Sequence, residues 1–173
     1  MTTISFSMPT TLTLDELSAM DSKQLENLYR AGCLPETFAT LDGTPKGRML
    51  AVRYLDHAPF LSVVTAWAES SFFPWDGKNF QATGPVTGKG INRIKLLKEF
   101  RWYPFEARLE RSLIDGKECI YLDYEQPDNP WFIRRIRDEL REVAPRLFLG
   151  TAMWKDGQGG AALVLWFALD NHG

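Results

Sequence analysis

The sequence predicts an α+β fold that is mainly β, an antiparallel meander that curls into a small barrel. Two β-hairpins carry this prediction, and no strand–helix–strand repeat competes with them. The first hairpin joins 105–114 to 117–124 through Asp115-Gly116, and the second joins 147–154 to 161–169 through a glycine-rich turn. Closing such a sheet on itself removes the exposed strand edges, which favours a barrel.

Short helices are expected ahead of the strands, after a flexible arm over 1–12. Thr13 stands three residues before a glutamate, which is the pattern of a capping box at a helix start. A second helix is expected to end at Gly32 in the left-handed conformation, and a third to begin near Pro35. Residues 13–173 are expected to form one globular domain.

The next part of the chain gives weaker patterns. We expect a strand over 47–55, a helix over 59–69 and a short strand over 78–81. The segment 84–90 resembles a phosphate-binding loop, but three residues instead of four separate its first glycines, and Gly90 stands where Ser or Thr is needed. We therefore expect a flexible loop there, placed as a lid over a pocket mouth.

The first hairpin predicts a charged face. With a two-residue turn, Arg108 opposes Asp123 and Glu110 opposes Tyr121, while the other face of the hairpin is largely apolar. If the charged face pointed into the barrel, Arg108, Tyr121 and Asp123 would orient a ligand, and Asp123 or Glu110 would serve as an acid or base. The alternative is that this is the solvated face of a half-buried sheet.

A helix is predicted over about 131–143, before the last hairpin. Ile136 and Leu140 fall on its apolar arc when 100° is assigned to each residue. Arg137 lies at the border of that arc, from which it would reach Asp123 and join the ligand site. The alternative for Arg137 is a salt-bridged, solvated helix face.

Tryptophans supply further candidates for ligand contact. Trp154 and Trp166 lie on the two strands of the final hairpin, where they would line a cavity or fill a core. The sequence does not choose between these two roles.

Composition limits the classes of function. A net charge of −2, with 20 basic and 22 acidic residues interspersed, argues against a nucleic-acid-binding domain. Two distant cysteines fit a reducing compartment, and the longest apolar run, 161–169, is too short to span a bilayer. We expect a cytoplasmic protein without a membrane partner. The two histidines form no ligand-spaced cluster, so we expect no metal.

The C-terminal third of the chain resembles uncharacterised bacterial lipocalin-like (calycin) domains, as a strand pair, a helix and a closing hairpin. The residues that carry the resemblance are 115–124, Asn129-Pro130, 134–142, Leu149-Gly150 and 167–169. Gly47-Arg48-Met49 stands where the family carries Gly-x-Trp. The resemblance implies a small barrel with an internal cavity for an apolar molecule, without a cofactor, and it transfers no catalytic residue.

The function expected first is therefore intracellular binding of a small hydrophobic molecule in a barrel cavity. The second is a cofactor-independent isomerase or cyclase of a secondary metabolite, with Asp123 or Glu110 as the acid–base group. The third is a protein-interaction domain without catalytic activity, which would contact its partner through exposed aromatics such as Trp75 or Trp131.

Overall fold

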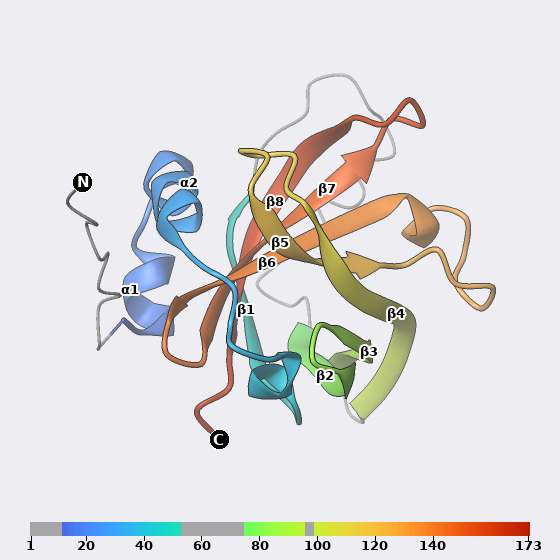
Figure 1. Ribbon diagram of the computed structural model, residues 1–173, viewed down its shortest axis with the longest axis horizontal. Helices are drawn as coiled ribbons and strands as arrows, with labels where there is room; N and C mark the ends of the chain where they lie inside the picture. The colour runs from blue at the N-terminus through green and yellow to red at the C-terminus, as the bar shows by residue number, and fades with distance from the viewer. Residues whose placement is uncertain (1–11, 53–74, 96–98) are drawn as a thin grey trace.

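The computed structural model describes residues 12–52, 75–95 and 99–173, and in it eight antiparallel strands form a closed barrel (Figure 1). Each strand pairs with the next in sequence, and the last pairs with the first. The strands are β1 (Lys46–Val52), β2 (Trp75–Gly84), β3 (Thr87–Lys95), β4 (Glu99–Arg111), β5 (Glu118–Asp123), β6 (Ile136–Ala144), β7 (Leu147–Lys155) and β8 (Ala161–Asp170). The predicted fold class is confirmed.

Short helices precede the barrel, as predicted. They are α1 (Leu14–Ser18), α2 (Ser22–Ala31) and the 3-10 turn η1 (Phe38–Leu41). The capping box at Thr13 is present, with hydrogen bonds in both directions between Thr13 and Glu16. The left-handed end of α2 was predicted wrongly, because Gly32 has a φ of −66° and continues into extended chain. The predicted arm falls almost entirely on residues that lie outside the described part of the chain.

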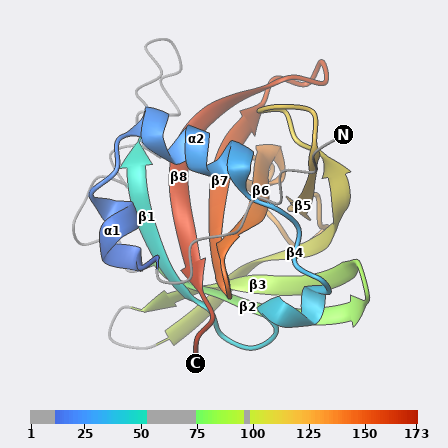
Figure 2. The same ribbon diagram turned by 60° about the vertical axis from the view of Figure 1, so that its left-hand side comes forward.

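The barrel wall separates two apolar clusters. On β8, Leu165, Phe167 and Leu169 pack in one cluster, while Trp166 and Ala168 pack in the other. The second cluster includes Leu17, Leu25 and Tyr29 of α1 and α2, and Figure 2 shows α2 lying across the outside of β7 and β8. The first cluster therefore lies in the barrel interior, and alternate residues of each strand belong to opposite sides of the wall.

The two ends of the barrel differ. At one end, which we call the η1 end, Phe38 and Leu41 join the interior cluster, and the rings of Phe38 and Phe80 lie 6.2 Å apart. At the other, which we call the far end, β5 connects to β6 and β7 to β8. There the inward-facing residues Ile136 and Ala152 are only partly buried.

The helix predicted over 131–143 is wrong. The chain there forms a short 3-10 turn, η2 (Ile133–Arg135), followed by strand β6, which pairs with β5 and β7 on its two sides. The charges at four-residue spacing fit a helix, but Ile136, Asp138 and Leu140 also alternate with Arg137, Glu139 and Arg141. Pairing with two neighbouring strands selects that alternation over local helix propensity.

The segment 84–90 is not the flexible loop that the sequence predicts. It contains a tight turn and the start of β3, which pairs along its length with β2. Aromatic rings occupy the space above its glycines: a Cβ on Gly90 would lie 2.4 Å from Cζ of Phe105, and one on Gly88 would lie 2.7 Å from Cζ of Phe80. The absence of a side chain at these glycines therefore allows the rings to pack against the strand and does not indicate a flexible loop.

Two other predicted strands are confirmed in part. Strand β1 occupies the described part of 47–55, and the predicted strand 78–81 is the middle of the longer β2. The helix predicted over 59–69 lies outside the described residues.

The turn around Asp115-Gly116 is longer than predicted. Arg108 pairs with Tyr121 and Arg111 with Glu118, so each residue opposes one that lies two positions earlier than expected. A shift of two residues leaves every side chain on its predicted face, because side chains alternate with a period of two. The division of the hairpin into an apolar and a charged face is therefore confirmed, although the register is not.

We predict that Leu140→Ala lowers the free energy of unfolding by about 2–5 kcal/mol, because it leaves a void in the barrel interior. Leu113→Ala makes the same chemical change on a side chain that is 45% exposed and is expected to cost less than about 0.5 kcal/mol. Urea unfolding of both variants measures the difference. Equal losses would contradict the placement of Leu140.

Candidate functional site

The charged face of the β4–β5 hairpin lies outside the barrel. Its inward-facing residues are the apolar ones, such as Ile120 and Leu122 in the interior cluster. Tyr121 pairs with Glu139, whose Oε2 accepts a hydrogen bond of 3.1 Å from Tyr29 of the external helix α2. The expectation that this face surrounds an internal ligand is therefore corrected: a closing sheet turns its apolar face inward.

Ion pairs and rings occupy this outer face. The guanidinium carbons of Arg108 and Arg137 lie 4.7 and 4.4 Å from the centre of the Tyr121 ring. Arg108 Nη1 donates to Asp123 Oδ2 at 2.8 Å, and its Nε lies 3.4 Å from Glu110 Oε1. Burial alone would raise the pKa of Asp123, but the backbone N–H of Glu125 and the Arg108 guanidinium lower it below its usual value. Such a carboxylate is a poor proton donor near neutral pH.

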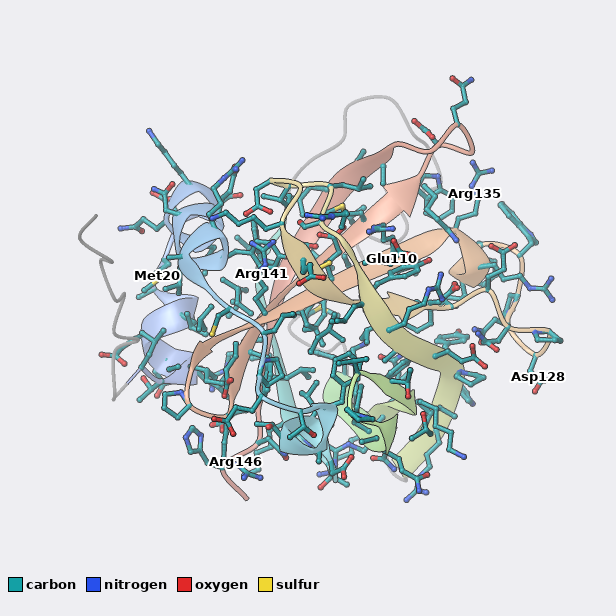
Figure 3. The ribbon with its side chains drawn as sticks, viewed as in Figure 1. Met20, Glu110, Asp128, Arg135, Arg141 and Arg146 are labelled. Carbon is teal, nitrogen blue, oxygen red and sulfur yellow. The ribbon has the colours of Figure 1, made fainter. Side chains whose placement is uncertain are left out.

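Arg137 stands directly opposite Asp123 in the β5–β6 pair and, like Arg141, donates hydrogen bonds to other neighbours on the same outer face. Arg137 Nε donates to Glu139 Oε1 at 2.7 Å. Arg141 makes two hydrogen bonds of 2.7 Å to the carboxylate of Asp115, and its guanidinium lies over the ring of Tyr29 (Figure 3 labels Arg141). These contacts hold the β4–β5 turn and α2 against β6. The two arginines lie on a strand and their ion pairs are largely buried, with Glu139 and Arg141 only 0% and 1% exposed, so they are not the solvated helix face that was the alternative for Arg137.

The tryptophans divide between the two sides of the wall. Trp166 lies outside, fully buried under α2, with its Nε1–H donating to Ser22 Oγ at 3.0 Å. Trp154 pairs with Ile136 and so faces inward at the far end, with the Arg135 guanidinium 5.6 Å from its ring centre. Trp75 also belongs to the interior, 5.6 Å from the ring of Phe167, whereas Trp131 is 65% exposed.

A polar cluster lies inside the barrel, among the apolar residues. It consists of Lys78 on β2, Asn92 on β3, Tyr124 at the end of β5 and Asp138 on β6. The side chains of Lys78 and Asp138 are only 3% and 5% exposed, and their Nζ and Oδ2 atoms lie 3.1 Å apart. Four strands thus bring one buried ion pair and two further polar groups to a single place. We take these four residues, the inner polar cluster, as the candidate functional site.

Hydrogen bonds connect all four members. Lys78 Nζ donates to Asn92 Oδ1 at 2.8 Å and to Tyr124 Oη at 2.6 Å, in addition to Asp138 Oδ2. The Tyr124 hydroxyl donates to Asp138 Oδ2 at 2.9 Å. The Trp75 indole donates to Asn92 Oδ1 at 3.2 Å. In contrast, Asp138 Oδ1 is buried and has no hydrogen-bond partner among the residues that the structure describes.

Aromatic rings surround the ammonium group of Lys78. Its Nζ lies 5.2–5.5 Å from the ring centres of four side chains, those of Trp75, Phe105, Tyr124 and Phe167. Burial lowers the pKa of Lys78, and the ion pair with Asp138 opposes that effect. Burial and the charge of Asp138 raise the pKa of Tyr124, so this phenol keeps its proton. The rings add a favourable cation–π interaction with the charged lysine.

Sequence reasoning did not select the inner polar cluster. Asp138 lies in the segment 131–143, which was predicted to be a helix. Lys78 had a usable signal, because it shares the inward-facing set of β2 with Phe80 and Ala82. A lysine in an otherwise apolar alternation needs a buried partner.

Within the described part of the chain, no three His, Cys, Asp or Glu side chains are grouped as a metal site. None of the helices found there has the length and hydrophobicity needed to cross a bilayer. His172 is exposed and contacts Asp170.

Comparisons with known proteins support the fold alone. No protein-family model and no curated protein matches the chain. A solved structure described as a protein from Thermomonospora curvata is similar, with a TM-score of 0.52 and 18% identity over 89% of each chain. At that identity the likeness supports the barrel, and the lipocalin-like identity remains a resemblance.

We predict that Lys78→Met lowers the free energy of unfolding by about 3–5 kcal/mol, because it leaves the Asp138 carboxylate buried without a counter-ion. The double variant Lys78→Met with Asp138→Leu should lose less free energy of unfolding than the sum of the losses in the two single variants. Lys95→Met, which breaks an ion pair with Asp76 through a lysine that is 57% exposed, should cost about 0–1 kcal/mol. Additive losses at Lys78 and Asp138 in chemical unfolding would show that the pair is not coupled.

A pH dependence is expected for the Asp115–Arg141 pair. The hydrogen bonds from Arg141 lower the pKa of Asp115 in the folded protein. The stability that this carboxylate contributes is therefore present above its unfolded value of about 3.9 and is lost as the pH falls through the lower, folded value. Asp115→Asn should be less stable than the wild type at pH 7, and the difference should shrink in acid. Thermal melts between pH 7 and 3 test this, with Asp128→Asn on the exposed β5–β6 connection as control (Figure 3).

Proposed function

We propose that the barrel binds a small, mainly apolar molecule in its interior, at the far end, in contact with Asp138. The observation that carries this proposal is Oδ1 of Asp138, a charged oxygen without a hydrogen-bond partner in the described part of the chain. Apart from the inner polar cluster, the interior around it consists of apolar and aromatic side chains. A buried carboxylate oxygen without a hydrogen bond is unfavourable by itself. A bound molecule or water that reaches this atom removes the penalty.

The energetics of the inner polar cluster favour a functional role. Removing two charges from water is costly, and an apolar pair of similar volume often stabilises a fold as well or better. The rings and leucines around Lys78 and Asp138 would fill a core without them. Buried titratable groups with shifted pKa values occur preferentially at functional sites, which supports the same interpretation.

The ligand is proposed to approach from the far end. Toward the η1 end, rings lie directly on glycines of the wall, with Phe105 over Gly90 and Phe167 over Gly150. At the far end, Ala152 pairs directly with Asp138 and is partly exposed. Trp154, two residues further along β7, faces the same side and remains a proposed ligand contact. The lipocalin-like resemblance also implies an apolar ligand inside a barrel.

Acid–base catalysis without a cofactor is the second candidate. Its carboxylate would be Asp138, beside the Tyr124 hydroxyl, and not Asp123 or Glu110 on the outside. We further propose an intracellular protein, because the chain carries only two cysteines, too few for a disulfide framework.

Binding of a neutral fluorescent probe tests the proposed site. We expect N-phenyl-1-naphthylamine to bind the wild type, and Ala152→Trp to weaken binding at least about tenfold, because an indole opposite Asp138 would occupy the place proposed for the ligand. Ala31→Trp, at the exposed C-terminal end of α2, is the matched control and should leave affinity unchanged. Circular dichroism confirms that both variants are folded.

Native mass spectrometry of the purified protein provides an independent measurement. A co-purifying small molecule, lost in Ala152→Trp and kept in Ala31→Trp, supports the proposal. Equal probe affinity in both variants, with no bound molecule in the wild type, would argue against an interior site.

A further inference from the structure

We propose that the ligand of the inner polar cluster is a neutral molecule that donates one hydrogen bond, from a hydroxyl or an N–H group, to Asp138 Oδ1. This inference rests on the proposed function and specifies the chemistry that the site recognises. It follows from counting the donors and acceptors that the cluster has already used.

Lys78 has no proton left for a ligand. An ammonium group has three N–H bonds, and Nζ lies within hydrogen-bonding distance of three acceptors: Asn92 Oδ1, Tyr124 Oη and Asp138 Oδ2. A carboxylate or carbonyl on the ligand would have to displace one of these buried partners. The lysine therefore neutralises and positions Asp138 instead of binding the ligand itself.

The side chains of Tyr124 and Asn92 also use all their hydrogen-bond donors and acceptors within the protein. The Tyr124 hydroxyl donates to Asp138 Oδ2 and accepts from Lys78 and from Asn92 Nδ2 at 3.3 Å. Asn92 Oδ1 accepts from Lys78 and from Trp75, and its Nδ2 also donates to the Tyr103 carbonyl at 3.3 Å. These bonds account for both lone pairs of each oxygen and all the polar hydrogens.

Asp138 Oδ1 is the acceptor that none of these hydrogen bonds reaches. The Asp138 side chain is only 5% exposed, and it faces the interior from β6. An ionised carboxylate oxygen only accepts hydrogen bonds. The group that completes the cluster must therefore be a donor.

Charge selects among donors. Lys78 and Asp138 already cancel each other within the cluster. An anionic ligand would meet the free carboxylate oxygen, and a cationic ligand would lie close to the Lys78 ammonium, in both cases within an apolar interior that weakly screens charge. A neutral alcohol, phenol or amide N–H avoids both repulsions.

Two matched ligand series on the wild-type protein test the inference. They comprise 2-naphthol, 2-methoxynaphthalene, 2-naphthoate and 2-naphthylmethylammonium, together with 1-octanol and its methyl ether, octanoate and octylammonium. Displacement of N-phenyl-1-naphthylamine at pH 7 gives their affinities. The neutral donor should bind at least about tenfold more tightly than its methyl ether in one or both series, and the anion should bind most weakly.

Asp138→Asn removes the charge of the acceptor and should reduce the preference for the alcohol or phenol over the ether, while Asp128→Asn should leave it unchanged. Ethers that bind as tightly as the donors would overturn the inference and leave the interior site intact, because Oδ1 would then be satisfied by water. Tightest binding of an anion would also overturn it, in favour of recognition by Lys78. If the probe and all eight compounds fail to bind, the proposed function itself fails.

Discussion

The pairing of β1 with β8 is the constraint on which the rest of the molecule depends. Because it closes the sheet, every strand has one side that faces the interior and one that faces α1, α2 or solvent. Consecutive polar side chains of one strand therefore lie in sharply different surroundings. Asp138 lies in an aromatic interior, while Glu139, its neighbour in sequence, is bound by Tyr29, Ser112 and Arg137 outside.

The interior combines two kinds of environment. Toward the η1 end it resembles an ordinary aromatic core, in which Phe38 and Phe80 pack together. Nearer the far end it contains an ion pair that the surrounding rings and hydrogen bonds hold in one arrangement. Such a network specifies the position of each member closely, because a shift of any one leaves a buried polar atom unpaired. The cluster is thus a preorganised arrangement with one acceptor free.

The sequence predicts the barrel and the two faces of the β4–β5 hairpin, because turn residues and alternation are local signals. The sequence predicts less clearly which face lies inside. Arg108 and Asp123 were chosen as site residues for their chemistry, but barrel closure buries the opposite face, which carries Ile120 and Leu122. The inner polar cluster joins four strands through long-range pairing, so Lys78 and Asp138 meet only in three dimensions. The assignment of 131–143 to a helix hid Asp138, because local spacing cannot reveal that β5 and β7 flank the segment.

Strand β6 contacts α2 on the outside of the barrel and Lys78 on the inside. Its Glu139 accepts from Tyr29 of α2, and the preceding residue, Asp138, holds Lys78 inside the barrel. A single peptide unit thus connects the docking of an external helix with the geometry of the internal carboxylate. The position of α2 and the direction of Oδ1 are therefore fixed by neighbouring residues of the same strand. The external helix and the barrel interior thus share one structural element, β6.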